Sequence, residues 1–342
     1  MNCTGVWTDD VQRLSGDRGR FRVRASKGIH LVVPRDRINS DTGLILRTEK
    51  SVLFVIPWGS RWLIGTTDTE WDLDRAHPAA SRSDIDYLLG CVNEVLATPI
   101  TAEDVVGVYA GLRPLLAGES EETSQLSREH AVASSAPGLV SVAGGKYTTY
   151  RVMARDAVDA AADHLDRPVP PSVTELVPLV GADGYAAMVN RLEALALELA
   201  VPPWMLRRLL RRYGSRVSEV LAPIRQEPAL GDPVPGADEY LAAEIRYAVT
   251  HEGALHLDDI LTRRTRISIE TTHRGVDSAQ AVSEIVAPVL GWSTETAERE
   301  VATYSARVES ERASQQETED VAADAARLLA PELRRTRETQ LS

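Results

Sequence analysis

The segment Gly144–Arg151 combines residue types that could hold a flat, negatively charged ligand. It reads Gly-Gly-Lys-Tyr-Thr-Thr-Tyr-Arg and connects the apolar run Leu139–Ala143 to a stretch with helical periodicity. Paired glycines let a ligand approach the backbone, and the first turn of a helix offers unpaired N–H groups with a partial positive charge. Lys146 adds a full positive charge. Because short glycine motifs are common at helix starts, a tight turn that binds no ligand is the alternative interpretation.

Two arginines are candidates for recognising an anionic substrate, because the planar guanidinium can donate paired hydrogen bonds to phosphate or carboxylate oxygens. Arg113 lies between an apolar run and Pro114, where we expect a proline-fixed turn. Its apolar neighbours in the sequence favour a partly buried guanidinium with a functional role. Arg128 follows the acidic loop 119–122, so a surface ion pair is the stronger interpretation for Arg128 taken alone.

His30 is a candidate general base. It lies in the apolar run Ile29–Val33, with Lys27 just upstream. A nearby positive charge lowers the pKa of an imidazole, and a neutral imidazole can accept a proton at pH 7. A strand histidine is more often a structural residue, so catalysis is the less common interpretation. The polar segment Gly65–Asp68 could hydrogen-bond an active-site group, although a turn at a strand end is favoured there.

The elements that must position these residues follow from hydrophobic patterning. Apolar alternation predicts an antiparallel sheet of at least three strands. The expected strands cover residues 21–24, 29–33, 52–57 and 62–64, with a hairpin turn at 58–61. Ser83 and Asp84 can cap a helix that runs towards Leu96. The strand 139–143 and the helix after Gly144 form a β/α unit of the kind that places ligands at the carboxyl ends of strands.

The second half of the chain is predominantly helical by periodicity. The proline-rich stretch 166–171 is the clearest linker before it. The basic segment Trp204–Tyr213 could lie on an anionic membrane surface, although the solvated face of a packed helix is the favoured interpretation. His251 and Glu252 do not complete a zinc motif, because residue 255 is Leu255, and we expect no metal site.

Composition excludes several classes of protein. A formal net charge of −12 argues against non-specific binding of nucleic acid, although a local basic pocket remains compatible with it. Only two cysteines occur, Cys3 and Cys91, which favours a reducing compartment. The sequence contains no apolar run of about 20 residues and no secretory signal pattern at Met1. We expect the cytoplasm, or a peripheral position on the inner face of a membrane.

Taken together, these motifs resemble the FAD-dependent, quinone-linked glycerol-3-phosphate dehydrogenase family over residues 1 to about 305. The segments that carry the resemblance are 2–7, 27–35, 55–58, 65–68, 111–115, 144–151, 244–253 and 261–265. The resemblance implies an α+β fold class in which residues 1–165 are the remainder of an FAD-dependent oxidoreductase domain, a partial FAD/NAD(P)-binding fold. This domain would hold an antiparallel substrate sheet at about 20–105 and a flavin-facing β/α unit at about 106–165.

After that domain, residues 172–305 would form an all-α C-terminal domain. From about residue 294 large apolar side chains become scarce, and we expect residues 306–342 to form a solvated helical or disordered tail.

The resemblance also implies a reaction, the oxidation of sn-glycerol 3-phosphate to dihydroxyacetone phosphate by hydride transfer to FAD, with electrons passed to a quinone. His30 would be the base or a group that orients the hydroxyl. Lys27, Arg113 and Arg128 would bind the substrate, and Lys146 would lie between substrate and flavin. The residues expected to line the flavin are Gly144, Gly145, Lys146, Thr148 and Thr149. His30, Arg113 and Lys146 are thus the expected catalytic set.

Two departures from the family qualify this expectation. Cys3 stands where the family has a small residue such as alanine, and no GxGxxG dinucleotide-binding turn occurs in the sequence. We therefore expect a truncated or mis-started form that holds FAD poorly by itself. The alternatives are a catalytically inactive binding or scaffold module and an oxidase that uses oxygen. The sequence leaves open whether the protein forms a homodimer and whether it contacts a membrane peripherally.

Overall fold

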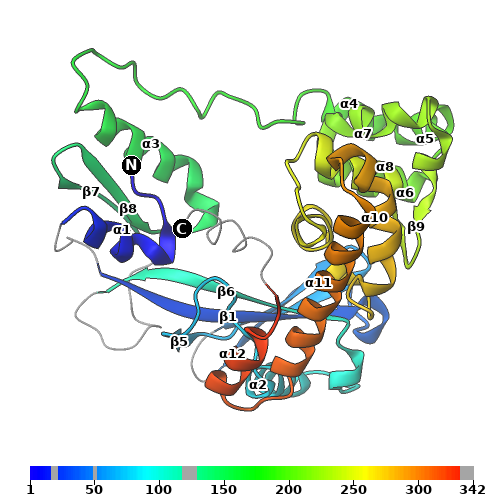
Figure 1. The fold of residues 1–342 in the computed structure, drawn as a ribbon, viewed down its shortest axis with the longest axis horizontal. Coiled ribbons are helices and arrows are strands. Elements are labelled where there is room, and N and C mark those ends of the chain that lie inside the picture. The colour runs from blue at the N-terminus through cyan, green and yellow to red at the C-terminus, as the bar shows by residue number, and fades with distance from the viewer. Residues whose placement is uncertain (17–21, 49–51, 118–128, 332–342) are drawn as a thin grey trace.

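The computed structural model describes residues 1–16, 22–48, 52–117 and 129–331, and a six-stranded antiparallel sheet lies at its centre (Figure 1). Its strands are β1 (Val23–Pro34), β2 (Leu44–Arg47), β3 (Val52–Trp58), β4 (Arg61–Gly65), β5 (Thr69–Trp71) and β6 (Gly107–Leu116). β1 is the organising strand, because β4 and β5 pair along one of its edges and β6 pairs along the other. The predicted antiparallel sheet and the hairpin between β3 and β4 are confirmed.

Strand β6 corrects two expectations. The turn expected at Pro114 is instead part of β6, where Pro114 lies opposite Ala25 of β1. Among the described strands β6 pairs only with β1, and such an edge position tolerates proline because the missing N–H would face away from the partner strand. The substrate sheet therefore extends to Leu116, beyond the boundary expected near residue 105.

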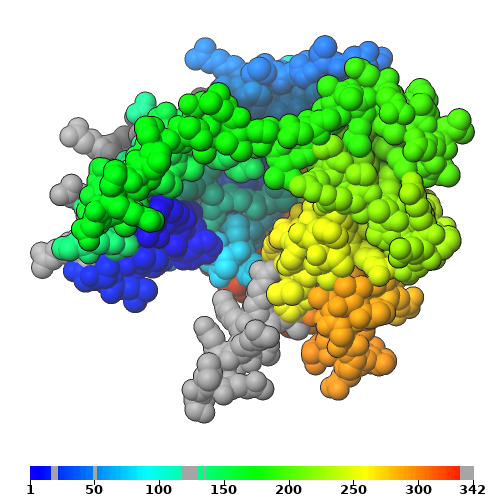
Figure 2. Space-filling view, turned by 90° about the horizontal axis from the view of Figure 1, so that it is seen from above, coloured from blue at the N-terminus to red at the C-terminus, as the bar shows by residue number. Residues whose placement is uncertain are grey.

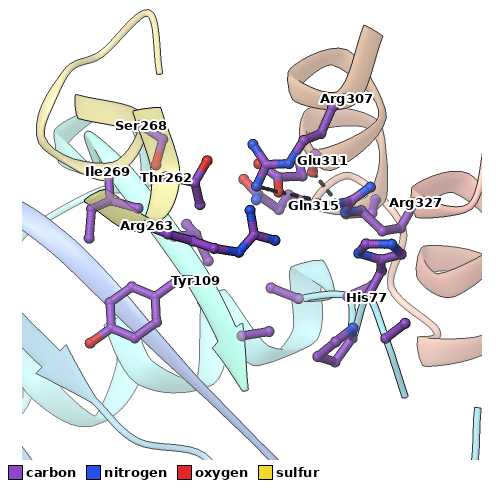
Figure 3. A pocket seen from close by; sticks show the side chains of 17 residues that line it. His77, Tyr109, Thr262, Arg263, Ser268, Ile269, Arg307, Glu311, Gln315 and Arg327 are labelled. Carbon is purple, nitrogen blue, oxygen red and sulfur yellow. Dashed lines mark hydrogen bonds and ion pairs between the residues drawn. The ribbon is translucent and has the colours of Figure 1, made fainter. Parts of the chain in front are cut away.

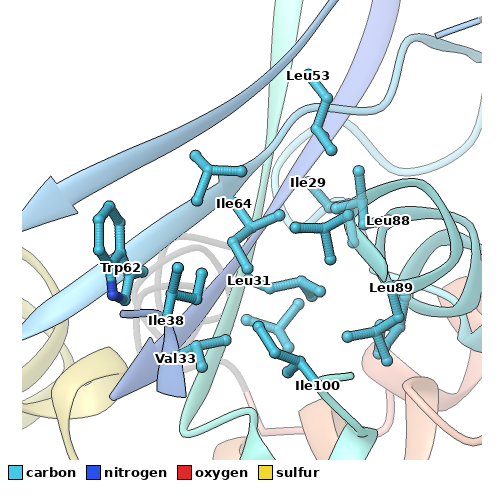
Figure 4. Close-up of a cluster of buried hydrophobic side chains, with 14 of the residues drawn as sticks. Ile29, Leu31, Val33, Ile38, Leu53, Trp62, Ile64, Leu88, Leu89 and Ile100 are labelled. Atoms are coloured by element: carbon cyan, nitrogen blue, oxygen red, sulfur yellow. The ribbon is translucent and has the colours of Figure 1, made fainter. Parts of the chain in front are cut away.

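Helix α2 (Arg82–Asn93) covers one face of the sheet (Figure 4). Ser81 and Asp84 form a reciprocal capping box, so the helix begins slightly earlier than the sequence suggested. Alternate residues of β1 point towards α2, as the two-residue period of a strand requires. The fully buried members of this core include Ile29, Leu31, Leu53, Trp62, Ile64 and Leu88.

A second unit lies on the opposite side of the sheet from α2 (Figure 1). It contains α1 (Thr8–Leu14), β7 (His130–Ala136), β8 (Leu139–Gly144) and α3 (Tyr150–Ala162). The expected strand at 139–143 is confirmed, and its neighbours are now defined. β8 pairs antiparallel with β7, and Asn2 forms a parallel bridge to β8. The Asn2 N–H donates to the Val140 carbonyl at 2.7 Å, and the Val142 N–H donates to the Asn2 carbonyl at 2.9 Å.

The connector 163–184 leads from α3 to the C-terminal helical domain (Figure 2). The helices of that domain are α4 (Tyr185–Asn190), α5 (Leu192–Glu198), α6 (Pro203–Tyr213), α7 (Val217–Leu221), α8 (Ala242–Thr250), α9 (Ile267–Glu270), α10 (Val276–Leu290) and α11 (Thr294–Ser314). A short hairpin of β9 (Pro233–Val234) and β10 (Ala237–Leu241) interrupts the expected all-helical pattern. The first domain and the helical domain flank a hollow in the surface, seen from above in Figure 2.

The chain then returns to the sheet, which corrects the solvated tail expected at 306–342. Helix α11 continues to Ser314, and α12 (Asp320–Arg327) packs beside α2 on the underside of the sheet (Figure 1). Ala323 of α12 is fully buried in a cluster with Ala25 and Trp71. The small alanines of α12 allow this close packing, and they are the reason that its sequence resembles a solvated helix. Residues 332–342 lie outside the described part of the chain.

Candidate functional site

His30 lies on the face of the sheet that points away from α2. It is directly opposite Gly65 of β4 and Tyr109 of β6, and side chains of directly opposed residues share a face. The imidazole stacks on the Tyr109 ring with centroids 5.0 Å apart and planes 6° apart. A Cβ atom at Gly65 would lie only 2.4 Å from the imidazole Cδ2. Gly65 therefore leaves the space that the His30 ring fills.

Arg113 shares this open face, because its register partner on β1 is Ser26. Its Nη2 donates to the Thr66 hydroxyl at 2.9 Å, and its Nη1 donates to the Thr67 carbonyl at 3.2 Å. The side chain crosses Gly28, where a Cβ atom would lie 2.4 Å from Nη2. Glycine at this position of β1 therefore allows the guanidinium to reach the loop after β4, next to His30.

The electrostatics of this face favour a neutral imidazole. Burial, and secondly the charge of Arg113, lower the pKa of His30 to about 4. The direction agrees with the expectation from the sequence, although the responsible charge belongs to Arg113 and not to Lys27. At neutral pH the ring can therefore accept a hydrogen bond at one nitrogen and donate one at the other.

Four residues of this face were not among the predicted site residues, namely Ser26, Thr66, Asp68 and Tyr109. Asp68 accepts a hydrogen bond from Ser26 and lies 3.7 Å from Arg113 Nη1. The segment Gly65–Asp68 does link two strands, but its hydroxyl and carboxylate also hold the guanidinium. The two-residue spacing of Ser26, Gly28 and His30 could have placed them on one face, whereas the register with β6 has no signal in the sequence.

Lys27 lies on the other face of β1, which does not support the expected contact with substrate. Its side chain is 0% exposed, and Nζ lies 2.6 Å from Asp84 Oδ2 and 2.5 Å from Asp320 Oδ1. The ammonium also lies 4.7 Å from the centroid of the Trp71 ring. Because successive strand residues point to opposite faces, the neighbour of Ser26 cannot share the face of His30. Lys27 joins α2 and α12 to the sheet.

The glycine turn after β8 forms as the sequence predicts. Gly144 and Gly145 have φ angles of +74° and +83°, which favour glycine, and a Cβ atom at Gly145 would lie 2.5 Å from Met153 Sδ. Lys146, Thr148 and Thr149 are exposed, and no side chain caps the start of the helix after the turn. The turn therefore presents a charge, two hydroxyls and the start of a helix to the surface.

This turn lies beside the end of β6. A Cβ atom at Gly144 would lie 3.0 Å from the Leu116 side chain, and Leu116 is the third residue after Arg113 on β6. Three residues of a strand span roughly 10 Å, and their odd number turns the Leu116 side chain to the face opposite that of Arg113. Arg128, the remaining predicted substrate residue, lies outside the described residues.

The basic helix α6 packs as part of the helical domain. Arg208 pairs with the fully buried Glu244, and Arg212 lies over the ring of Tyr213. The described residues contain no helix that is both long and apolar enough to cross a membrane. Within the same part of the chain, no group of three or more His, Cys, Asp or Glu side chains is placed to hold a metal ion.

Comparison with known proteins gives matches along almost the entire chain. Residues 1–151 match the family model of FAD dependent oxidoreductases, and residues 172–297 match the model of the C-terminal domain of alpha-glycerophosphate oxidase. Glycerol-3-phosphate dehydrogenase 2 of Mycobacterium tuberculosis is 63% identical over 98% of this chain and 57% of its own length. Glycerol-3-phosphate dehydrogenase of Mycobacterium leprae is 60% identical over the same shares. The chain thus spans somewhat more than half of these relatives.

A solved structure agrees with this match. The glycerol-3-phosphate dehydrogenase of Bacillus halodurans, complexed with FAD, aligns with a TM-score of 0.75 and 28% sequence identity. The alignment covers 89% of this chain and 60% of the other chain.

Proposed function

Because the chain belongs to the FAD-dependent glycerol-3-phosphate dehydrogenase family, we propose that its open sheet face binds sn-glycerol 3-phosphate and oxidises it to dihydroxyacetone phosphate. The observation that carries this proposal is the convergence of His30 and Arg113 on one face of the sheet. We also propose FAD as the cofactor and a quinone as the final electron acceptor, as the family resemblance implies.

Arg113 is proposed to bind the substrate phosphate. Its side chain is 29% exposed, and the guanidinium is fixed by the Thr66 hydroxyl and the Thr67 carbonyl. A guanidinium held in this way loses little further side-chain entropy when it binds a phosphate. Asp68, at 3.7 Å, offsets only part of the charge, so a dianionic ligand still gains from the contact.

His30 is proposed to act on the secondary hydroxyl of the substrate. Oxidation removes a proton from this hydroxyl and a hydride from the carbon that bears it. A pKa of about 4 makes the free imidazole a weak base, which favours hydrogen bonding that orients the hydroxyl. A phosphate bound at Arg113 would offset the charge that lowers this pKa, so substrate binding itself would make His30 more basic.

The Gly144 turn is proposed to hold the flavin edge. Positive φ angles at both glycines expose the backbone of the turn, and the helix start after it has no side-chain cap. Bound FAD would supply the hydride acceptor. Lys146 and the helix N-terminus would stabilise negative charge that develops on the ring, and Thr148 would donate a hydrogen bond to it. The Thr149 hydroxyl donates to the Lys146 carbonyl at 3.0 Å and would line the flavin while it fixes the turn.

The proposal is tested by reduction of bound flavin. One arm contains the chain with FAD, and a second arm adds the part of the Mycobacterium tuberculosis relative that the chain does not match. Anaerobic sn-glycerol 3-phosphate is expected to bleach the visible flavin band in at least one arm, whereas glycerol at the same concentration is not. The absence of bleaching in both arms would contradict the proposed reaction. The first arm also tests the expectation that the chain alone holds FAD poorly.

A further inference from the structure

A cavity of about 190 Å³ lies at the junction between the sheet and the C-terminal helices (Figure 3). It is lined by the loop before α2, by strand β6, by the π-helix η9 (Asp259–Arg264), and by residues from α9, α11 and α12. None of the proposed glycerol 3-phosphate or flavin residues lines it. The cavity adjoins the candidate site only through Tyr109, which stacks on His30, and its ligand can be inferred independently of the proposed function.

Basic side chains outnumber acidic ones in the lining of this cavity. Arg263 comes from η9, Arg307 from α11 and Arg327 from α12, and Figure 3 shows them converging with His77 around one space. Glu311 is the single carboxylate of the lining. It lies 2.6 Å from Arg307 Nη2 and 3.5 Å from Arg327 Nη2.

Further carboxylates approach the arginines from outside the lining. Asp258 pairs with Arg263 and lies 2.8 Å from Arg307 Nε, and Asp259 lies 3.6 Å from Arg263 Nη1. These carboxylates hold the guanidinium groups in place. The groups that face the cavity itself remain mainly cationic.

Two buried polar atoms in the lining have no partner among the described residues. These are the hydroxyl oxygen of Ser268, a residue that is 5% exposed, and Nη1 of Arg307. Buried polar groups in folded proteins are nearly always hydrogen-bonded, because an unmade bond leaves the cost of desolvation uncompensated. A hydroxyl and a guanidinium N–H can both donate to the same oxygen-rich ligand. The pair of unsatisfied atoms therefore points to a bound acceptor.

We propose that this cavity binds a small oxyanion of the phosphate class and thereby fastens the C-terminal helices to the sheet. At about 30 Å³ for each water, the volume corresponds to roughly six water molecules. That is enough for inorganic phosphate or a short phosphate ester, and it is below the roughly 300 Å³ at which ordinary cofactor pockets begin. Arg263 and Arg327 would grip the anion from two elements that are distant in sequence.

The ligand would also act near the candidate site. Tyr109 lines the cavity at the edge of β6 and stacks on His30. An occupied cavity would therefore hold the strand that carries Tyr109 and Arg113 against the helical domain. Binding to the folded state alone raises the melting temperature in proportion to the logarithm of ligand concentration above the dissociation constant.

The experiment is thermal unfolding of the chain in sodium phosphate and in sodium chloride of equal ionic strength. We expect a saturable rise in Tm with phosphate only. Arg263→Gln, which removes a partly exposed charge, should weaken phosphate binding at least tenfold, and Ser268→Ala should weaken it about threefold while the fold is preserved. Arg225→Gln, on an exposed surface away from the cavity, should leave the affinity for phosphate unchanged.

A further variant separates this cavity from the proposed substrate site. The rise in Tm with phosphate should persist in Arg113→Gln. If Arg113→Gln loses this rise while Arg263→Gln and Ser268→Ala keep it, the inference is overturned. The absence of any phosphate-specific rise in Tm would overturn it as well. Titration of Arg113→Gln with glycerol 3-phosphate distinguishes the source, since tighter binding than inorganic phosphate would indicate an ester and weaker binding would indicate the free anion.

Discussion

The two faces of strand β1 each carry a positive charge, and they hold it in different ways. On the face towards α2 and α12, Lys27 is 0% exposed and lies within 2.6 Å of two carboxylates. On the open face, Arg113 keeps 29% of its side chain exposed, and its close contacts include a hydroxyl and a carbonyl. The first charge is compensated by anionic groups of the protein. The second is oriented by neutral oxygens and only partly offset by one carboxylate, Asp68, at 3.7 Å.

This difference teaches how to separate structural from functional charges. A fully buried charge between two carboxylates is out of reach of a ligand from solution, and its removal strands the carboxylates. A charge at the surface that is only partly offset by carboxylates can still attract an anion. By this criterion Lys27 belongs to the scaffold and Arg113 to the candidate site. Both residues were candidates for substrate binding when only the sequence was considered.

Lys27→Met should have the largest effect, and the effect should be on stability. Removing the ammonium leaves Asp84 and Asp320 close together without a cation, which typically costs about 3–5 kcal/mol for a buried pair. Urea denaturation of the chain measures the change in the free energy of unfolding. Arg113→Gln is the matched control and should lose less than half as much. Equal losses in the two variants would erase the distinction between the faces.

His30 should make the stability depend on pH. Its pKa falls from 6.5 in the unfolded chain to about 4 in the folded protein. Between these values the unfolded chain binds the additional proton, so the contribution of His30 is complete above pH 6.5 and decreases as the pH falls towards 4. The decrease amounts to at most about 3 kcal/mol. Denaturation at pH 7 and pH 4.5 should show a smaller pH effect in His30→Gln, whereas identical profiles would contradict the assignment.

The sequence predicts the local structure around both faces of β1 well. The two-residue period of β1, the helix α2 and the glycine turn at Gly144 are all local patterns, and the structure confirms them, although Ser81 caps α2 together with Asp84 where Ser83 was expected. The predictions failed where distant segments meet. Arg113 pairs with Ser26 across 87 residues, and Lys27 bonds Asp320 across 293 residues. Neither long-range contact is encoded in a local pattern. Helix α12 resembles a solvated helix because its buried contacts are made by small alanines.

Lys146→Ala should affect catalysis without affecting stability. The side chain is exposed, so its loss should leave the free energy of unfolding within about 0.5 kcal/mol of the original. In the FAD-loaded enzyme, kcat/KM should fall by at least about 2 kcal/mol of transition-state stabilisation. Steady-state kinetics together with urea denaturation measure both quantities. Normal kinetics would remove Lys146 from the proposed site.

The central claim, that the open face of β1 recognises a phosphorylated alcohol through Arg113, is tested most directly by substrate discrimination. The rate of anaerobic flavin reduction is measured with sn-glycerol 3-phosphate and with glycerol, in the original enzyme and in Arg113→Gln. We predict that kcat/KM for sn-glycerol 3-phosphate falls by at least about 2 kcal/mol, while the weak reaction with glycerol is nearly unchanged. An undiminished preference for the phosphorylated substrate in Arg113→Gln would contradict the account.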